Sequence, residues 1–486
     1  MISSESGAKS AEKRSLRRDS IAFVGTVGSA VGIQAPAGGV SFLPALMAGI
    51  VGLSGPASFG SAVVVMLFVA FAFVVFTRAF ASAGSVYTFT GRVLGVRYGV
   101  FAAWLLLLAY VAFASSVFAS NANALVTLFF PQLLGTPFWL VMAGLLWAAT
   151  IFLVRYSIRV STVLIFVLEA VAVVLIGVVA VAMLVHEPAR VASLGLQPFN
   201  PVGVPIGVLA PGVIFAFTGF AGFEVAATLG EESRAPRRVI PAAMVTALVV
   251  SGAIYTVMSY VETVAYPSAS ALAAAADHGV PLAAIADRFV GSGMGAAVIV
   301  ASIISGFGAQ LAAANGAARL LFAGGRAGIV PGRVEFTHPR FRTPTRAIAV
   351  VAVATIVPLL ALNSRSPLGA FDDLATYGAD LIVVAYLLSL IAAVVFSIRQ
   401  RRAARVVVLA VGVLLVGYVI AATVFPFPAG ESRWYLIAAG LSLVAGGVIA
   451  ATLRRDRLRT AELFGDDPVP PTAERMTASS ATRPVE

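Results

Sequence analysis

We take three carboxylates as candidate functional groups, because each lies in a segment that is otherwise apolar enough to cross a bilayer: Glu169, Glu224 and Asp380. An ionisable side chain at membrane depth is costly, so it usually binds a cation, carries a proton or fills a gap in a helix. Glu224 fits two roles, a group that changes protonation during a functional cycle or a neutral acid bonded to a backbone gap. Asp380 either contacts a cationic ligand or makes a polar contact near the start of its helix, alongside Asp372 and Asp373.

Glycines interrupt two apolar segments, "VGTVGSAVGIQAPAGG" near the N-terminus and "AFTGFAGFE" directly before Glu224. Unpaired backbone groups cost several kcal/mol in lipid, so a broken helix persists only where it lines a protein cavity. Its free N–H groups attract an anion and its free C=O groups a cation, and a zwitterion needs one of each. The alternative is that these glycines only allow close packing of helices.

Other chemistries are poorly supported. The chain has no cysteine, and its three histidines, His186, His278 and His338, are dispersed in loops or at span ends, so we expect no metal site. A sodium site would need paired hydroxyl ligands, and the apolar segment 292–322, the eighth of the spans given below, offers only Ser302 and Ser305. No nucleotide motif follows a strand, and no nucleophile stands with a base. We therefore expect no cofactor and no enzyme activity.

The composition places the chain in a bilayer. Of its residues 59% are hydrophobic and 11% charged, with a mean hydropathy of +0.97, whereas soluble domains are about a quarter charged. Apolar segments long enough to cross about 30 Å of hydrocarbon recur along the whole chain. We predict an all-α polytopic membrane protein with twelve spans: 21–47, 55–77, 98–130, 137–154, 159–185, 206–230, 240–264, 292–322, 345–362, 368–397, 404–425 and 432–453.

The basic residues predict the orientation. With the N-terminus inside, all but four of the 33 Lys and Arg residues fall on the inner side; the exceptions are Arg190, Arg288, Arg365 and Arg433. This asymmetry follows the positive-inside rule and explains the net charge of +11 without a nucleic-acid partner. It predicts a multi-pass protein of the plasma (inner) membrane, embedded in the lipid bilayer, with both termini cytoplasmic.

Four stretches resemble the amino acid–polyamine–organocation superfamily of permeases, and the resemblance covers about residues 20–400. They are "GFAGFEVAATLGEESRAPRRVIPAAM", "ASAGSVYTFTGRVLG", "NGAARLLFAGGRAGIVPGRVEFTHPRFRTPTRAI" and "LSGPAS". The resemblance implies a 5+5 inverted-repeat core with broken helices 1 and 6, plus two C-terminal helices. The corresponding division is a cytoplasmic tail (1–20), two repeats (21–205 and 206–400), helices 11 and 12 (401–455), and a disordered tail (456–486).

The same resemblance implies import or exchange of amino acids by alternating access, with proton-coupled symport or exchange as the coupling. A polyamine or organic amine permease is the alternative. Helices 1, 2, 6 and 7 would rock against a scaffold of helices 3, 4, 8 and 9. The partners are then a small-molecule substrate and protons, and we take a monomer as the default.

Residue by residue, the resemblance assigns the substrate site to both breaks. The backbone N–H groups of Ser29, Ala30, Val31 and Gly32 would bind a carboxylate, and the carbonyls of Thr218, Gly219, Phe220, Ala221 and Gly222 would bind an amine. Tyr110 and Asn315 would form walls of the pocket, or else make ordinary packing and helix–helix contacts. Glu224 is the residue that the resemblance links to protons, and Glu169 lies one residue from a position where some relatives carry a lysine.

Overall fold

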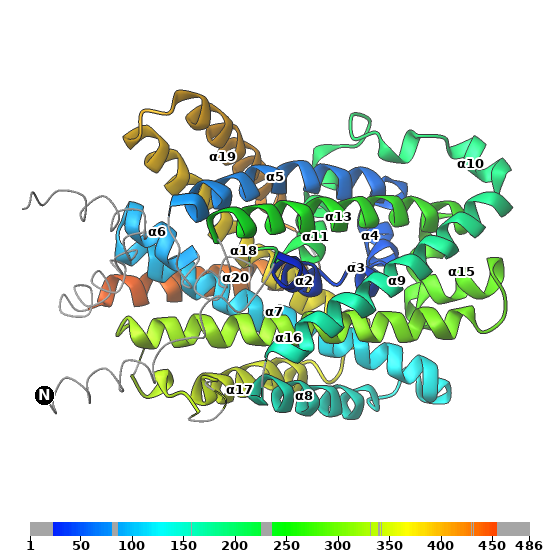
Figure 1. Ribbon diagram of the computed structural model, residues 1–486. Coiled ribbons are helices and arrows are strands. Elements are labelled where there is room, and N and C mark those ends of the chain that lie inside the picture. Colours follow the sequence, from blue (N-terminus) through cyan, green and yellow to red (C-terminus); the bar gives the residue numbers. More distant parts are fainter. Residues whose placement is uncertain are drawn as a thin grey trace, which may run out of the picture.

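The computed structural model describes residues 23–79, 86–156, 158–224, 236–330, 332–338, 341, 343–428, 430 and 432–453. These residues form helices and connecting turns, without a strand, and the long helices run roughly side by side in one bundle (Figure 1). The centre of the bundle brings together α7, α16 and α18, which are distant in sequence. The all-α prediction is confirmed for this part of the chain.

The principal helices are, in chain order, α2 (Phe23–Gln34), α3 (Pro36–Gly39), α4 (Leu43–Val51), α5 (Gly55–Ala79), α6 (Val86–Leu94), α7 (Val96–Phe129), α8 (Trp139–Tyr156), α9 (Ile158–His186), α10 (Pro188–Leu194), α11 (Ile206–Phe220), α13 (Pro236–Ala265), α14 (Ala269–Ala275), α15 (Pro281–Phe289), α16 (Met294–Arg326), α17 (Thr345–Ala361), α18 (Pro367–Arg399), α19 (Ala403–Val424) and α20 (Ser432–Thr452).

Nine helices of the described chain are long and apolar enough to cross a membrane, or ten if the bent pair of α14 and α15 counts as one span. This finding supports a polytopic membrane protein, but the count is smaller than the twelve spans predicted. The first, sixth and ninth predicted spans are the ones missing from it. In the structure α2 has 12 residues, α11 has 15 and α17 has 17, which explains why each falls short.

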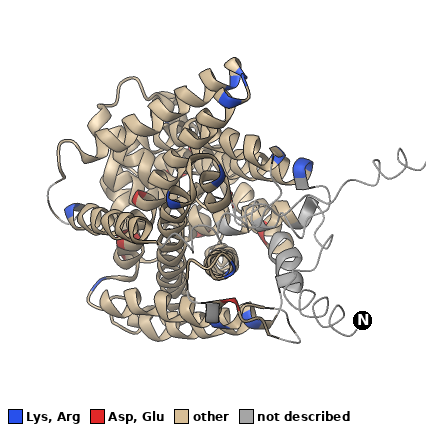
Figure 2. Ribbon diagram, turned by 90° about the vertical axis from the view of Figure 1, so that its left-hand side faces the viewer, with Lys and Arg blue, Asp and Glu red and all other residues tan. Residues whose placement is uncertain are grey.

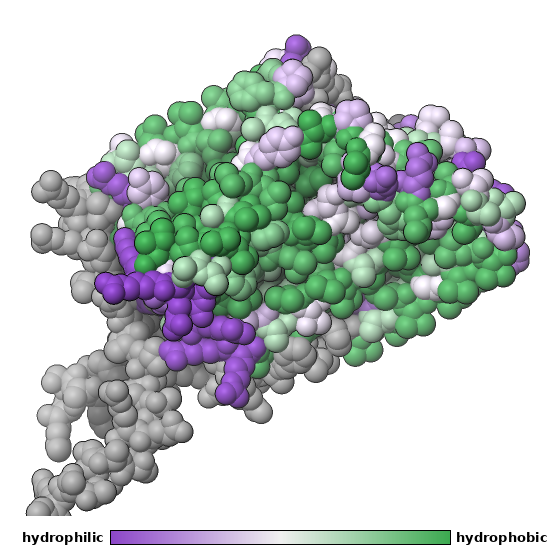
Figure 3. Space-filling model, turned by 90° about the horizontal axis from the view of Figure 1, so that it is seen from above, coloured by the Kyte–Doolittle hydropathy of each residue, from purple (hydrophilic) through white to green (hydrophobic). Residues whose placement is uncertain are grey.

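The surface is that of a protein immersed in lipid. Figure 3 shows a broad apolar surface between a hydrophilic end and an opposite end of mixed polarity. Outward-facing apolar side chains on α9 and α19, such as Val181 and Leu414, are 63% and 72% exposed. Basic residues lie at the ends of helices, among them Arg155, Arg326 and Arg399. Figure 2, which views the bundle from one end, shows blue segments both at its rim and over the middle of that end.

The connection after α13 contains the short helices α14 and α15. α14 packs on α4, and α15 packs on α16 and α9. The tails 1–20 and 456–486 lie outside the described residues, as do residues 80–85 and 225–235 of two family-like stretches. The predictions for those segments therefore stay predictions.

Candidate functional site

The first predicted break is real, but its position was wrong. α2 continues as a helix through Ser29–Gly32, and the chain leaves the helix at Ala35, whose backbone is left-handed with φ 41° and ψ 56°. Pro36 is the physical reason: it has no N–H to continue the helix, and it disfavours a right-handed helical residue before it. The backbone groups freed by the break therefore belong to the residues around Pro36, whereas the N–H groups of Ser29–Gly32 lie within a helix.

Side chains from two other helices occupy the N–H groups of α3. The N–H of Ala37 donates to Glu169 Oε1 on α9 at 3.0 Å, and the N–H of Gly38 donates to Ser305 Oγ on α16 at 2.9 Å. Glu169 is buried, and its second oxygen, Oε2, has no hydrogen-bond partner among the described residues. The predicted carboxylate Glu169 thus lies at the first break with half of its acceptor capacity unused.

The break in the sixth span was predicted across Thr218–Gly222, and in the structure it covers fewer residues. α11 continues to Phe220, and the chain becomes extended at Ala221, with φ −57° and ψ 144°. Gly222 has φ 92°, a left-handed conformation that glycine adopts without a steric penalty. Its N–H donates to Glu224 Oε2 at 3.0 Å. The break therefore lies at Ala221 and Gly222, while Thr218 and Gly219 stay helical.

Glu224, next to this break, forms hydrogen bonds with side chains of two further helices. Tyr110 on α7 donates its hydroxyl to Oε1 at 2.7 Å, and Tyr386 on α18 donates to Oε2 at 2.7 Å. All three side chains are buried. With Gly222, the carboxyl group accepts three hydrogen bonds from groups on three segments. Sequence analysis proposed Tyr110 as a pocket wall and missed Tyr386, which nothing in its local sequence distinguishes from a packing tyrosine.

Gln34 connects the two breaks, and sequence analysis missed it. Its Nε2 donates to the carbonyl of Phe220 at 3.1 Å, and its Oε1 accepts the hydroxyl of Ser251 at 2.8 Å. The carbonyl of Gln34 accepts the hydroxyl of Tyr255 at 2.7 Å. A glutamine directly before Ala-Pro in an apolar span was the available signal, because a buried amide needs partners.

Tyr255 on α13 packs between the breaks. A Cβ at Gly39 would collide with its hydroxyl group, and a Cβ at Gly219 would lie 2.9 Å from its ring. The ring stacks on Phe59 at 5.5 Å between centroids and meets Phe220 edge-on at 5.6 Å. Two of the glycines therefore serve close packing, the alternative left open for the glycine-rich segments, and they do so at the breaks themselves.

Two proposed site residues do not join this network. Asn315 donates its side-chain amide to the carbonyl of Leu311, one turn back in its own helix, at 3.0 Å. Asp380 is buried on α18, two turns after Asp373, and no hydrogen bond joins it to Gln34 or Glu224 among the described residues. The α18 side chain that reaches the breaks is Tyr386.

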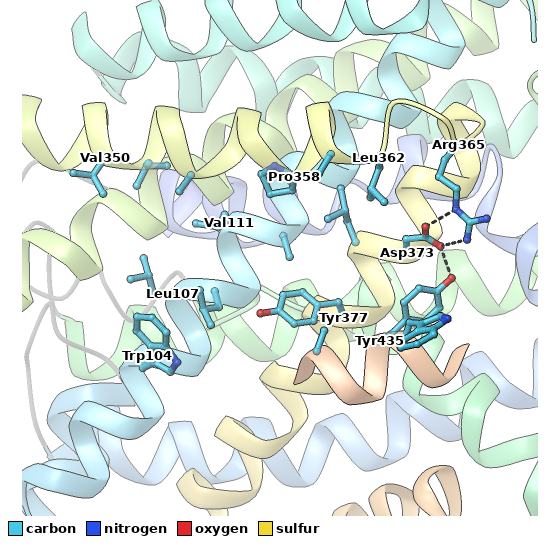
Figure 4. Close-up of a pocket in the computed structure, with 18 of the residues that line it drawn as sticks. Trp104, Leu107, Val111, Val350, Pro358, Leu362, Arg365, Asp373, Tyr377 and Tyr435 are labelled. Carbon is cyan, nitrogen blue, oxygen red and sulfur yellow. Dashed lines mark hydrogen bonds and ion pairs between the residues drawn. The ribbon is translucent and has the colours of Figure 1, made fainter. Parts of the chain in front are cut away.

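A large cavity lies elsewhere, between α7, α17, α18 and α20 (Figure 4). Its volume is about 880 Å³, and its lining is almost wholly apolar. At one end Arg365 donates to Asp373, with Nε to Oδ2 at 2.8 Å, and Tyr435 also donates to Asp373. No residue of either break lines this cavity. It is therefore separate from the site at the breaks.

The buried charges are all acidic. In the described part of the chain, Glu169, Glu224, Glu262, Asp373 and Asp380 are buried, and no Lys, Arg or His side chain is buried with them. Glu262 on α13 was missed by sequence analysis, although an acid in the apolar seventh span carried the same signal as the other three. Such an interior suits a cation or protons far better than an anion.

The chain is similar to known membrane transporters. The family described as amino acid permease matches residues 21–448. The low-affinity putrescine importer PlaP of Escherichia coli is 28% identical over 317 residues, which are 63% of this chain and 67% of PlaP. The branched-chain amino acid permease BcaP of Bacillus subtilis is 27% identical over 423 residues, 82% of this chain and 84% of BcaP. The chain therefore belongs to the amino acid permease family of membrane transporters.

Proposed function

We propose that this chain is a secondary active transporter that moves an amino acid across the plasma membrane by alternating access. The observation that carries the proposal is the meeting of two interrupted helices, α2–α3 and α11, through the side chain of Gln34. Interrupted spans in corresponding positions of two repeats are typical of transporters, which bind substrate where the breaks meet. Rocking of one helix group against the other would alternately open this place to each side.

The family architecture accounts for the spans that are too short to stand alone. With α4 assigned to an interrupted first span (α2–α4) and α5, which follows a turn at Gly52, kept as the second, the first span, α11 and α17 add three to the nine long helices of the described chain and give twelve. Residues 21–205 and 206–400 would be the two inverted repeats, with 401–455 adding two helices. The basic helix ends would face the cytoplasm, together with both termini, and the transporter would work as a monomer.

In this proposal an amino acid binds by exchanging places with groups of the protein. Its carboxylate takes the N–H groups of Ala37 and Gly38, which Glu169 and Ser305 occupy in the closed arrangement. Its ammonium group binds near the carbonyl of Phe220 at the end of α11, where Gln34 now donates. Binding would thus release both contacts and free the two breaks to move.

A specific observation favours a second candidate, an organic amine. Glu169 already supplies a carboxylate to the first break, and its Oε2 is free to accept a bond from an ammonium group. A tethered carboxylate competes strongly with one from solution because its effective concentration is high. Among the relatives, PlaP is described as a putrescine importer and BcaP as a branched-chain amino acid permease, so both classes are represented.

Uptake by the purified chain in liposomes tests both candidates. We would supply radiolabelled branched-chain and cationic amino acids and putrescine, with and without an inward proton gradient and with and without internal cargo. Accumulation of an amino acid supports the first candidate, and accumulation of putrescine without amino acids supports the second. Uptake that requires preloaded cargo would identify an exchanger, whereas no transport of any compound would contradict the proposal.

We further propose that Glu224 couples transport to protons. Gly222 can only donate to the carboxyl group, but the tyrosine hydroxyls can donate or accept. A proton on Oε1 would therefore make Tyr110 the acceptor and reverse that hydrogen bond. Glu224→Gln should leave uptake with little dependence on the proton gradient; a fully gradient-dependent variant would remove Glu224 from the mechanism.

A further inference from the structure

Glu262 is a buried acid that the contacts at the breaks leave unused. It lies near the end of α13 that leads into α14, and its side chain is fully buried. Neither of its carboxyl oxygens has a hydrogen-bond partner in the described part of the chain. Glu224, by contrast, is just as buried but accepts three hydrogen bonds. Among the described residues, therefore, no hydrogen bond stabilises a negative charge on Glu262.

The groups around this end of α13 do not compensate Glu262. Arg190 donates to the carbonyls of Tyr266 and Pro267, and Arg288 pairs with Glu187 at 3.1 Å. Burial raises the pKa of Tyr266, so this phenol stays neutral. The remaining ionisable residues on the helices packed against α13, and on α13 itself within the described ranges, are Arg78, Glu169, His186, Arg237, Arg238, Tyr255, Tyr260, Asp287 and, next to α14, Asp277 and His278.

An unpartnered carboxylate in such a place costs several kcal/mol, whereas a carboxylic acid costs far less. The described structure offers no cation within hydrogen-bonding reach of Glu262. The arrangement seen here therefore favours a neutral Glu262 over a charged one. Hydration of this end of α13 would remove that restriction, because water can stabilise the charged form.

The position of Glu262 links it to the first break. Ser251 and Tyr255, on the same face of α13 at helical spacing, both bond to Gln34. Glu262 continues this face two turns beyond Tyr255, toward the end with α14 and α15. A movement that separates α13 from the first span would therefore break the contacts to Gln34 and also displace the helix face that carries Glu262.

We infer that Glu262 is a second proton-binding site, which must be protonated before the outer side of the transporter can close. This inference rests on the proposed alternating-access function and its orientation. In the closed arrangement the acid holds its proton; when the outer side opens, water exchanges that proton with the outside. A lower external pH then favours the protonated acid, promotes closure and increases import.

Chemical labelling tests the protonation of Glu262 without any transport measurement. Dicyclohexylcarbodiimide, an apolar reagent that reacts with protonated carboxyl groups, would be added to the full chain in liposomes, and adducts would be located by mass spectrometry. We expect an adduct on Glu262 at pH 7 and at least about tenfold less on the exposed Asp277. Labelling of other buried acids without Glu262 would overturn the inference.

The dependence of uptake on external pH tests the coupling. Binding of one proton changes the uptake rate by at most about tenfold per pH unit. In Glu262→Gln the dependence of the uptake rate on external pH should therefore be weaker than in the wild type, by up to about tenfold per pH unit. Asp277→Asn, at an exposed acid in the connection that follows α13, is the matched control and should keep the wild-type slope. An unchanged slope in Glu262→Gln would contradict the inference. It would also be contradicted if putrescine protected Glu262 from the carbodiimide while the extent of labelling did not depend on pH.

These readouts also separate the two proposals. If no cargo is transported, the proposed function fails, while the labelling pattern still decides whether Glu262 is protonated. If Glu262→Gln does not fold, Glu262→Asp replaces it: a shorter acid keeps the proton and should keep the pH slope. Loss of the slope in a folded Glu262→Asp that still reacts with the carbodiimide would overturn the inference.

Discussion

Each of the two interrupted spans has one buried carboxylate at its break, but the hydrogen bonds of the two carboxylates differ. Glu224 at the sixth-span break accepts bonds from Gly222, Tyr110 and Tyr386, so both of its oxygens are engaged. Glu169 at the first break accepts a bond from Ala37 with one oxygen and leaves the other without a partner. The same residue type therefore closes one break completely and the other only in part.

This difference indicates a division of roles. A fully bonded carboxyl group joins three segments and is suited to transmit a change of protonation between them. A carboxylate with an unused oxygen retains the capacity to bind an ammonium group of the cargo. Gln34 then connects the two places, since it bonds to α11 and, through Tyr255 and Ser251, to α13. Four tests with substituted variants would break or sharpen this contrast.

The largest effect is expected from Gly39→Ala, which attacks the packing that both breaks share. A Cβ at Gly39 would collide with the hydroxyl of Tyr255, which is itself bonded to Gln34. Overpacking of this kind costs about 1–3 kcal/mol, and the loss of the break geometry should reduce uptake to about a tenth or less. Thermal unfolding and initial uptake rates measure the two effects. Gly49→Ala, whose Cβ would find its nearest neighbour at 3.8 Å, is the control and should behave like the wild type.

Removal of the Glu224 donors should have the next largest effect. In Tyr110→Phe and Tyr386→Phe the carboxyl group loses one partner each, and an unsatisfied buried polar group costs about 1–3 kcal/mol. We expect each variant to reduce uptake by about tenfold and the double variant by less than the product, because the donors share one acceptor. Double-variant analysis of uptake rates checks this. Strict additivity would mean that Glu224 does not join the helices as a unit.

Glu169→Gln tests the other half of the contrast. The amide keeps an acceptor for Ala37 but removes the charge, so folding stability should change little. For a cargo whose ammonium group binds to Glu169, the Michaelis constant should rise by about tenfold, equivalent to about 1.4 kcal/mol. For a cargo whose carboxylate must displace Glu169, the constant should fall instead. Uptake at graded cargo concentrations distinguishes these results, and an unchanged constant for every cargo would exclude Glu169 from recognition.

The smallest effect is expected from Asp380→Asn. Asp380 makes no hydrogen bond to Gln34 or Glu224 among the described residues, and it lies two turns from Asp373 on the same helix. We expect an uptake rate within about twofold of wild type, because a substitution away from the network should change the free energy of unfolding by about 0.5 kcal/mol or less. A large rise in the Michaelis constant for amines would instead place Asp380 in the cargo path and weaken the assignment of recognition to Glu169.

Much of the site could be predicted because it depends on residue type and local order. The glycines and the carboxylate of "AFTGFAGFE" predict a break beside a buried acid, and the structure has it at Ala221, Gly222 and Glu224. The position of the first break was predicted from glycines and the family pattern. In the structure Pro36 sets this position, and the chain leaves the helix at Ala35, directly before the proline. Gln34 and Glu262 also carried a signal, since each is a polar group in an apolar span.

The sequence by itself determined that this chain is an apolar helical membrane protein with two interrupted spans and several acids at membrane depth. Hydrophobicity, glycine and proline act locally, so their effects can be read along the chain. Only the tertiary structure decided the partners of each acid: Tyr386 for Glu224, Ala37 for Glu169, and none for Glu262 among the described residues. These contacts join helices far apart in sequence, and their geometry depends on how the helices pack against one another.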